Sequence, residues 1–388
     1  MPRTVSVVIP TRNAGPGLSP VLEAIRSQRD VGELELIVVD SESGDGTVDT
    51  ARSAGARVIQ AAADAFNHGR TRDRAVEASS GDVVFMTVQD AVLVGEHAIR
   101  DLTLELAGDE RLAAVGARHI PRSDSDLFGA YSLWLHESAM AEGRARPAGA
   151  QARTAIERRA DASLDNVCSV IRREAWAEVR FRDLRYGEDL DFGLRAVELG
   201  WRIARSRRVA VVHSHARDAA YHLRRHVVDR LIVPILVNES RRGAVLASPG
   251  EIAAAASNVV GELAAAIRAA VDTPDVELDD FLADVSTRLE GKPDAAPVDA
   301  ELRDLVALLG SPDGVDGRVA DTLRARVAAA LRSKPVVVWS GRQRAVKVED
   351  GRAFVARLAA TALGAMLGDA IRLTGANSPL ATRLTAGI

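Results

Sequence analysis

The stretch Asp82–Ala91 reads DVVFMTVQDA, an apolar and β-prone run that ends in the polar pair Gln89-Asp90. Such a run is typical of a strand that is buried on both faces of a parallel sheet. In open α/β sheets, ligands bind just beyond the carboxyl ends of the strands, so the end of this strand is a candidate binding site. Asp90 has two interpretations there: its carboxylate holds a divalent cation, or it caps the next helix.

The segments around this stretch alternate between strand and helix patterns. Strands are predicted at residues 5–9, 34–39, 57–59, 83–87, 113–117, 166–171 and 209–212, and helices at 18–25, after 47, and at 69–78, 173–178 and 186–199. This alternation predicts a doubly wound, Rossmann-like and mainly parallel sheet. The first strand is followed by Pro10-Thr11-Arg12-Asn13 and not by a glycine-rich loop. That sequence excludes a dinucleotide-binding fingerprint and a Walker A loop.

The second half of the chain has a different pattern. Between residues 218 and 388, helical periodicity dominates, and the breaks near residues 249, 274, 293 and 312 contain proline. We therefore expect two domains, an α/β domain at 1–217 and a mainly helical domain at 218–388. Within the first domain, the polar segment Arg144–Arg159 is predicted to be a mobile surface loop.

Composition excludes several classes of protein. A net charge of −4 argues against a general nucleic-acid binder, whose domain is usually strongly basic. The single cysteine, Cys168, rules out an intramolecular disulfide and a cysteine-rich zinc site. No signal peptide and no apolar run of membrane-spanning length are visible. We expect a cytoplasmic protein, and a peripheral contact with the inner face of the cell membrane and a homo-oligomer are left open.

Four sequence blocks resemble the family 2 glycosyltransferases. They are VVIPTRN at 7–13, IVVDSESGDGT at 37–47, FNHGRTRD at 66–73 and GEDLD at 187–191. Within that family the chain is most similar to rhamnosyltransferases, through the FNHG run, the Gln89-Asp90-Ala91 tip, the segment NVCS at 166–169 and HSH at 213–215. The resemblance covers residues 5–215 and implies the GT-A nucleotide-sugar-binding fold.

The resemblance implies a site for the sugar-nucleotide donor. The residues that it assigns to this site are Pro10, Thr11, Arg12, Asn13, Asp40, Ser41, Ser43, His68, Gly69, Arg72, Gln89 and Asp90. Asp40 would accept a hydrogen bond from the base, and the alternative is an Asx-turn or a helix cap. Arg72 would reach the diphosphate, and the alternative is a surface ion pair with Asp73 or Asp82.

The resemblance also implies a metal site, a general base and acceptor-side residues. Many relatives carry Asp-x-Asp where this chain has Val88-Gln89-Asp90, so one carboxylate remains. We expect Asp90 with His213 or His215 to bind Mg²⁺ or Mn²⁺, and the alternative is that these are polar loop histidines. Asp189 is the candidate general base, although an acid-rich helix start is the simpler explanation of its position. The acceptor-side candidates are Asn166, Ser169 and Glu188.

We therefore expect an inverting, metal-dependent hexosyltransferase of cell-envelope polysaccharide synthesis. The best guess is transfer of rhamnose from dTDP-rhamnose to a hydroxyl of a saccharide or lipid-linked acceptor. Three alternatives are kept: a different nucleoside-diphosphate sugar as the donor, a nucleotidyltransferase, and a non-catalytic protein that binds sugar nucleotides as a scaffold.

Overall fold

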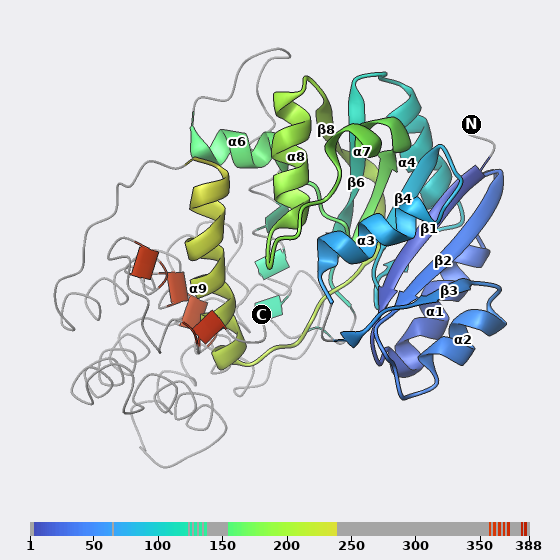
Figure 1. Ribbon diagram of the computed structural model, residues 1–388, viewed down its shortest axis with the longest axis horizontal. Coiled ribbons are helices and arrows are strands. Elements are labelled where there is room, and N and C mark those ends of the chain that lie inside the picture. Colours follow the sequence, from blue (N-terminus) through green and yellow to red (C-terminus); the bar gives the residue numbers. More distant parts are fainter. Residues whose placement is uncertain are drawn as a thin grey trace, which may run out of the picture. The chain divides into compact units, whose positions relative to one another are not determined.

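The computed structural model describes residues 4–63, 66–122 and 154–238, together with scattered positions at 125–137 and 357–385. The chain divides into two compact units. The first comprises Met1–Ser123, Leu133–Ser214 and Leu236–Glu239, and it contains the whole sheet (Figure 1). The second comprises Asp124–Ser132, His215–Ile235 and Ser240–Ile388.

The first unit is built on an eight-stranded sheet with the order β3-β2-β1-β4-β7-β6-β8-β5. The strands are β1 Thr4–Thr11, β2 Glu33–Asp40, β3 Arg57–Gln60, β4 Val83–Thr87, β5 Val92–Leu93, β6 Leu112–Ile120, β7 Cys168–Arg172 and β8 Arg202–Val212. The first four pair in parallel. β7 lies antiparallel between β4 and β6, while β8 is parallel to β6 and antiparallel to β5. The α/β class and a mainly parallel sheet are confirmed, but the sheet is mixed, because β5 and β7 run against the other six strands.

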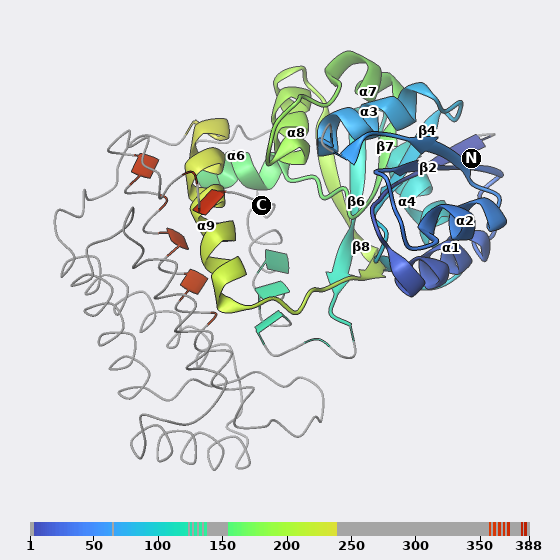
Figure 2. The same ribbon diagram turned by 60° about the horizontal axis from the view of Figure 1, so that its bottom comes forward.

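Helices cover both faces of this sheet (Figures 1 and 2). They are η1 Gly15–Gly17, α1 Leu18–Arg26, α2 Thr47–Ser53, α3 His68–Glu77, α4 Ala98–Ala107, α6 Ala155–Ala162, α7 Arg173–Val179 and α8 Glu188–Glu198. One core packs α1, α2 and α4 against one face, and the other packs α3, α7 and α8 against the opposite face. β4 contributes to both cores, because Phe85 points into the first and Met86 into the second. The strand that we predicted to be buried on both faces is therefore buried on both faces.

The predicted loop Arg144–Arg159 is wrong at its carboxyl end. Residues Ala155–Ala162 form helix α6, and the residues at 144–153 lie outside the described part of the chain. A capping box starts the helix: the Thr154 side chain accepts a hydrogen bond from the Glu157 N–H, and the Glu157 side chain accepts one from the Thr154 N–H. These reciprocal bonds satisfy two backbone donors that a helix start leaves free.

The predicted helical domain is described in part. Helix α9, Ala219–Leu236, lies in the region predicted to be helical, and single positions between 357 and 372 are helical. Most of the predicted helical domain lies outside the described residues. Among the helices that the structure describes, none is both long enough and apolar enough to cross a membrane.

Candidate functional site

One edge of the sheet collects the carboxyl ends of six strands. β1, β2, β3 and β4 run in the same direction, and so do β6 and β8 because β7 is antiparallel to both β4 and β6. For the same reason the amino end of β7, not its carboxyl end, lies at this edge. The polar residues that the topology brings to the edge are Thr11, Asp40, Gln89, Asp90, His119, Asp165, Asn166 and His213.

Asp40 at the end of β2 organises the first part of the edge. Its carboxylate is fully buried and accepts hydrogen bonds from Thr11 Oγ1 at 2.9 Å, from Ser43 Oγ at 2.6 Å and from the Ser43 N–H at 2.9 Å. Ser43 Oγ in turn accepts a hydrogen bond from the Asn13 N–H at 2.8 Å. The Asp40 side chain thus bonds the backbone N–H three residues on, one residue further than in an Asx-turn. A role of these residues in binding a base stays a prediction.

The same edge holds β1 and β4 together through Gln89. Strand β1 continues past Pro10 to Thr11, two residues beyond the predicted end at residue 9. The Gln89 side chain then accepts a hydrogen bond from the Arg12 N–H at 2.8 Å and donates one to the Arg12 carbonyl at 3.2 Å. Arg12 itself is exposed, so its guanidinium is accessible from solvent beside this clamp.

The block at residues 66–73 contacts the segment that leads into the GEDLD block. Asn67 caps α3 by accepting a hydrogen bond from the Arg70 N–H at 3.1 Å, and its side-chain amide donates to the Leu184 carbonyl at 2.8 Å. A Cβ on Gly69 would lie 2.2 Å from the Arg182 carbonyl oxygen. Asn67 and Gly69 therefore have structural reasons to be Asn and Gly. The neighbouring His68 is exposed, and its ring packs edge-to-face on Phe66.

Arg72 forms an ion pair with Glu188, and both side chains are almost fully buried. This pair replaces the two alternative partners suggested by the sequence, since Asp73 instead accepts hydrogen bonds from Trp176 Nε1 and the Phe181 N–H. Glu188, which we expected on the acceptor side, is the acid that holds Arg72. The pair fixes α3 against the start of α8.

Asp189 follows Glu188 in the first turn of α8. Its carboxylate is partly buried and accepts a hydrogen bond from the Leu190 N–H at 2.8 Å. Burial raises the pKa of Asp189 to about 7; the charges of Glu188 and Asp165 add to the rise, and Arg72 opposes it. A carboxylate with a pKa near neutrality is suited to accept a proton at physiological pH. The role of Asp189 as a general base stays a prediction.

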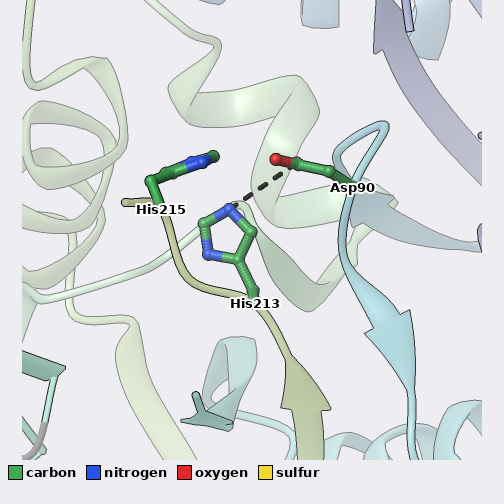
Figure 3. Close-up of side chains that lie close together, drawn as sticks. All are labelled: Asp90, His213 and His215. Atoms are coloured by element: carbon green, nitrogen blue, oxygen red, sulfur yellow. Dashed lines mark ion pairs between the residues drawn. The ribbon is translucent and has the colours of Figure 1, made fainter. Parts of the chain in front are cut away.

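Asp90, His213 and His215 form a cluster with the geometry of a cation site (Figure 3). One ligand atom of each residue lies within 4.8 Å of the others, and His213 Nε2 is 3.6 Å from Asp90 Oδ1. The His213 N–H donates to the Ile120 carbonyl at 3.0 Å, which continues the β6–β8 pairing and places His213 at the strand end. One carboxylate and two imidazoles form a donor set that fits Mn²⁺ better than Mg²⁺. These residues would hold such a cation.

A second polar cluster borders this one, and the sequence reading missed it. His119, at the end of β6, lies with Nε2 3.3 Å from Asp165 Oδ2. Glu137 accepts a hydrogen bond from the His119 N–H at 3.0 Å and is paired with Arg205 of β8. Burial lowers the pKa of His119. The pKa of Asp165 falls to about 2, because the raising effect of burial is outweighed by the charge of His119, the hydrogen bond from the Val167 N–H and other neighbours.

The signal for these residues was partly present in the sequence. Arg118-His119 directly follows a predicted strand, which is the position that drew attention to Gln89-Asp90. Asp165 precedes a predicted strand, and it reaches the edge only because β7 is antiparallel. The expected acceptor-side residues Asn166 and Ser169 lie beside it and are buried, with Ser169 Oγ donating to Asn166 Oδ1 at 3.2 Å. Cys168 between them is also fully buried, and burial raises the pKa of its thiol.

Comparisons with known proteins point to one family. Residues 6–180 match the model of glycosyl transferase family 2. The O-antigen chain rhamnosyltransferases RfbN of Salmonella typhimurium (strain LT2) and WbaN of Salmonella anatum are each 28% identical, over 223 and 222 residues respectively. Each match spans 54% of this chain and 66% of the relative, so the chain spans slightly less than two thirds of these relatives.

Solved structures with similar folds are more distant. The mannosyltransferase PcManGT from Pyrobaculum calidifontis, in complex with GDP-Man and Mn²⁺, has a TM-score of 0.47 at 20% identity and covers 86% of this chain and 88% of its own. TarS of S. aureus in complex with UDP has a TM-score of 0.42 at 16% identity and covers 85% and 89%.

Proposed function

Because residues 6–180 carry the glycosyl transferase family 2 domain, we propose that this protein transfers a sugar from a nucleoside-diphosphate sugar to a hydroxyl group of an acceptor. The observation that carries the proposal is a series of neighbouring polar groups along one sheet edge. Asp90 lies beside His213, the His213 ring packs on His119, and His119 lies beside Asp165. The charge of Asp165 in turn contributes to the raised pKa of Asp189, which connects the candidate cation site with the candidate base.

The proposed reaction is a single displacement at the anomeric carbon. Asp189 takes the proton of the acceptor hydroxyl, whose oxygen forms a bond to the anomeric carbon. The bond between that carbon and the diphosphate oxygen breaks, and the nucleoside diphosphate leaves with the electron pair. Attack on the face opposite the leaving group inverts the configuration at this carbon.

The chain's own residues divide the remaining tasks. Asp90, His213 and His215 would hold Mn²⁺ or Mg²⁺, which when bound supplies positive charge for the departing diphosphate. Asp40, Ser43 and the loop Pro10–Asn13 would surround the nucleoside. Because the Gln89 amide clamps the Arg12 backbone, we assign Gln89 to the shaping of this loop. Arg72, held by Glu188, acts on Asp189 through its charge and lowers the pKa that burial raises.

The names of the two Salmonella relatives, O-antigen chain rhamnosyltransferases, favour rhamnose as the sugar. A saccharide or lipid-linked acceptor stays a prediction. We propose dTDP-rhamnose as the first donor to test, ahead of UDP-glucose and GDP-mannose. The location at the inner face of the cell membrane and the homo-oligomer stay predictions.

The test is a donor screen followed by a product measurement. The thermal unfolding midpoint is measured with each nucleotide sugar, with and without Mn²⁺, because a ligand that binds the folded state raises it. For a donor that binds, release of the nucleoside diphosphate is measured with saccharide acceptors. Release of inorganic diphosphate from a nucleoside triphosphate would instead indicate a nucleotidyltransferase, and binding without any release would indicate a scaffold protein.

The metal part of the proposal has its own test. We expect Asp90→Ala and His213→Ala to lose transfer by at least tenfold and to lose the Mn²⁺-dependent stabilisation by donor. Activity of the unaltered protein that persists in excess chelator would contradict the role given to these residues.

A further inference from the structure

His119 is a histidine that the proposed reaction does not use, and its side chain is more deeply buried than those of the candidate metal ligands His213 and Asp90. Its side chain is 4% exposed, against 13% for His213 and 32% for Asp90. Its backbone N–H donates to Glu137, which is itself paired with Arg205, and its residue partner across the sheet is Val211, two positions before His213. These contacts fix the backbone position that carries the ring.

The His119 ring has two contacts at this edge. Nε2 lies 3.3 Å from Asp165 Oδ2. The ring also packs edge-to-face on the ring of His213, with 5.8 Å between the centroids and 80° between the planes. Among the described residues, Nε2 has no partner of hydrogen-bond geometry, so the Asp165 carboxylate is the group that compensates its burial.

Asp165 is equally well placed to act through His119. It sits at the amino end of the antiparallel strand β7, and the Val167 N–H donates to its Oδ1 at 3.0 Å. That bond leaves the other oxygen, Oδ2, directed at the histidine. A carboxylate anchored by its own backbone turn is a rigid support, since the turn fixes both its position and its orientation.

We propose that Asp165 and His119 are positioning residues that hold the His213 ring in the orientation in which it can bind a cation together with Asp90. The proposal rests on the function proposed above. In metal sites, partners outside the ligand set orient the ligating histidines, and their loss typically weakens metal binding 10- to 100-fold. Here the support reaches the ligand through a second ring, so we expect an effect at the lower end of that range.

A buried histidine that only fills the core is the competing explanation, and it makes a different prediction. Such a residue would lower the stability of the whole protein when removed, without a selective effect on the metal. A positioning pair instead weakens Mn²⁺ binding while binding of the nucleotide in the absence of metal is unchanged. Two residues that act as one unit also give non-additive effects when both are removed.

The experiment is a Mn²⁺ titration of the full-length protein, with and without dTDP, followed by the loss of the EPR signal of free Mn²⁺. We expect His119→Leu and Asp165→Ala each to weaken Mn²⁺ binding about tenfold. The double variant should weaken it no further, and Asp165→Asn, which keeps an oxygen facing Nε2, should recover part of the loss. Binding of dTDP in EDTA should stay within twofold of the unaltered protein for all four.

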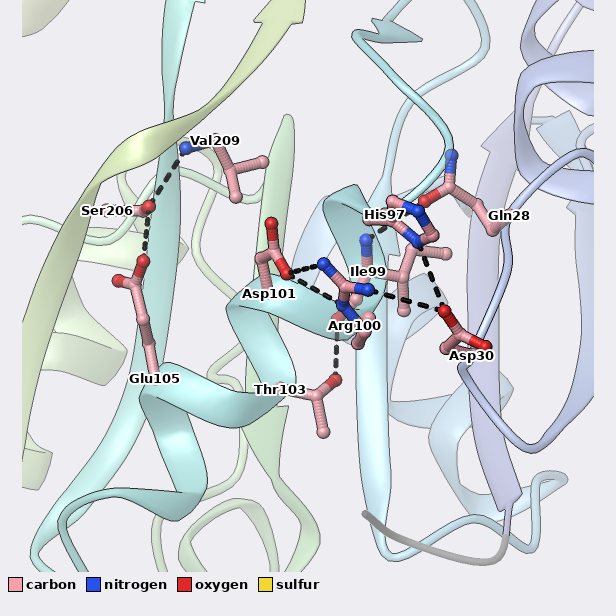
Figure 4. A network of polar contacts seen from close by, with 10 residues as sticks. All are labelled: Gln28, Asp30, His97, Ile99, Arg100, Asp101, Thr103, Glu105, Ser206 and Val209. Carbon is pink, nitrogen blue, oxygen red and sulfur yellow. Dashed lines mark hydrogen bonds and ion pairs between the residues drawn. The ribbon is translucent and has the colours of Figure 1, made fainter.

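Matched controls are available at other places in the same unit (Figure 4). His97 Nδ1 lies 3.5 Å from Asp30 Oδ2, a second histidine–aspartate pair, and Asp30 lies before the amino end of β2. Ser206 is a buried polar residue of β8, the strand that carries His213, and donates to Glu105 at 2.7 Å. His97→Leu, Asp30→Ala and Ser206→Ala should leave Mn²⁺ binding within twofold.

The outcomes separate this inference from the proposed function. If Asp90→Ala and His213→Ala abolish Mn²⁺ binding but His119→Leu and Asp165→Ala do not weaken it, the positioning role is wrong and the metal site stands. If the unaltered protein binds no Mn²⁺, the metal site and the positioning role both fail. Circular dichroism checks folding, and His119→Gln and Asp165→Asn replace any variant that does not fold, with a loss of several-fold then expected.

Discussion

At the residue scale, two adjacent carboxylates have different environments. Glu188 forms an ion pair with the buried Arg72, whereas the partly buried Asp189 meets the negative charges of Glu188 and Asp165. Pairs of neighbouring acids with such different electrostatic surroundings are typical of sites where one acid has a structural role and the other transfers a proton. We therefore expect Glu188 to have the structural role and Asp189 to be the group that changes its protonation state near pH 7.

The pH dependence of transfer follows from this assignment. A general base acts in its deprotonated form, and burial raises the pKa of Asp189 to about 7. We therefore expect the transfer rate at saturating donor to fall about tenfold for each pH unit below pH 7 and to level off above it. The rate is measured from pH 5 to 9 with a donor identified in the screen.

Substitution of the same residue is the complementary test. Asp189→Asn keeps the shape of the side chain and removes the base, so we expect a loss of about 10²- to 10⁴-fold in transfer with donor binding intact. A variant that transfers at nearly the normal rate would show that another group takes the proton.

At the element scale, α8 is positioned by a close helix contact. Gly193 lies in its middle, and a Cβ there would sit 1.8 Å from the Ala162 carbonyl oxygen at the end of α6. The helix that begins with Glu188 and Asp189 thus packs directly against backbone, which sets its distance from α6. A glycine inside a helix costs helix stability, and here it allows α8 to approach the backbone of α6 closely.

Gly193→Ala tests this contact. The added methyl group must displace the backbone of α6, and we expect the free energy of unfolding to fall by about 1–3 kcal/mol or more, measured by urea denaturation. Gly17→Ala is the control, because a Cβ at Gly17 meets no atom within 4 Å and the residue already has an ordinary negative φ of −65°. Equal stabilities of the two variants would contradict the packing role.

The sequence predicted elements better than it predicted how they pair. Apolar runs such as Val83–Thr87 gave strands at the observed places, since burial on both faces leaves a local pattern. α6 was missed although the Thr154-x-x-Glu157 capping box was visible in the sequence. The direction of β7 carries no local signal, because strand pairing is decided by residues far apart in the chain. Asp165 was missed for that reason.

At the scale of the whole sheet unit, the Arg72–Glu188 pair joins parts that are distant in sequence. Arg72 lies in α3, which leads into β4, and Glu188 lies in α8, which leads into β8. The pair therefore links the parallel half of the sheet to the mixed half. That Arg72 pairs with Glu188 was not predictable from the sequence, because Asp73 and Asp82 are nearer in the chain. In the structure, Asp73 instead accepts hydrogen bonds from Trp176 and Phe181.

Removing one member of this pair leaves the other charge buried. Arg72→Met should lower the free energy of unfolding by about 3–5 kcal/mol, whereas Arg72→Met with Glu188→Leu should recover most of that loss. Both variants are compared by urea denaturation at pH 7. A double variant as unstable as the single one would show that the pair is not the cause of the loss.

Cys168, the single cysteine, is a built-in probe for local unfolding of the sheet. The thiol is fully buried in β7 at the centre of the sheet and resists ionisation, so a thiol-reactive dye cannot attack it in the native state. Each labelled molecule has therefore passed through an opening of the middle of the sheet that exposed the thiol. Labelling rates would report how donor or Mn²⁺ slows that event, in unmodified protein and at concentrations too low for calorimetry.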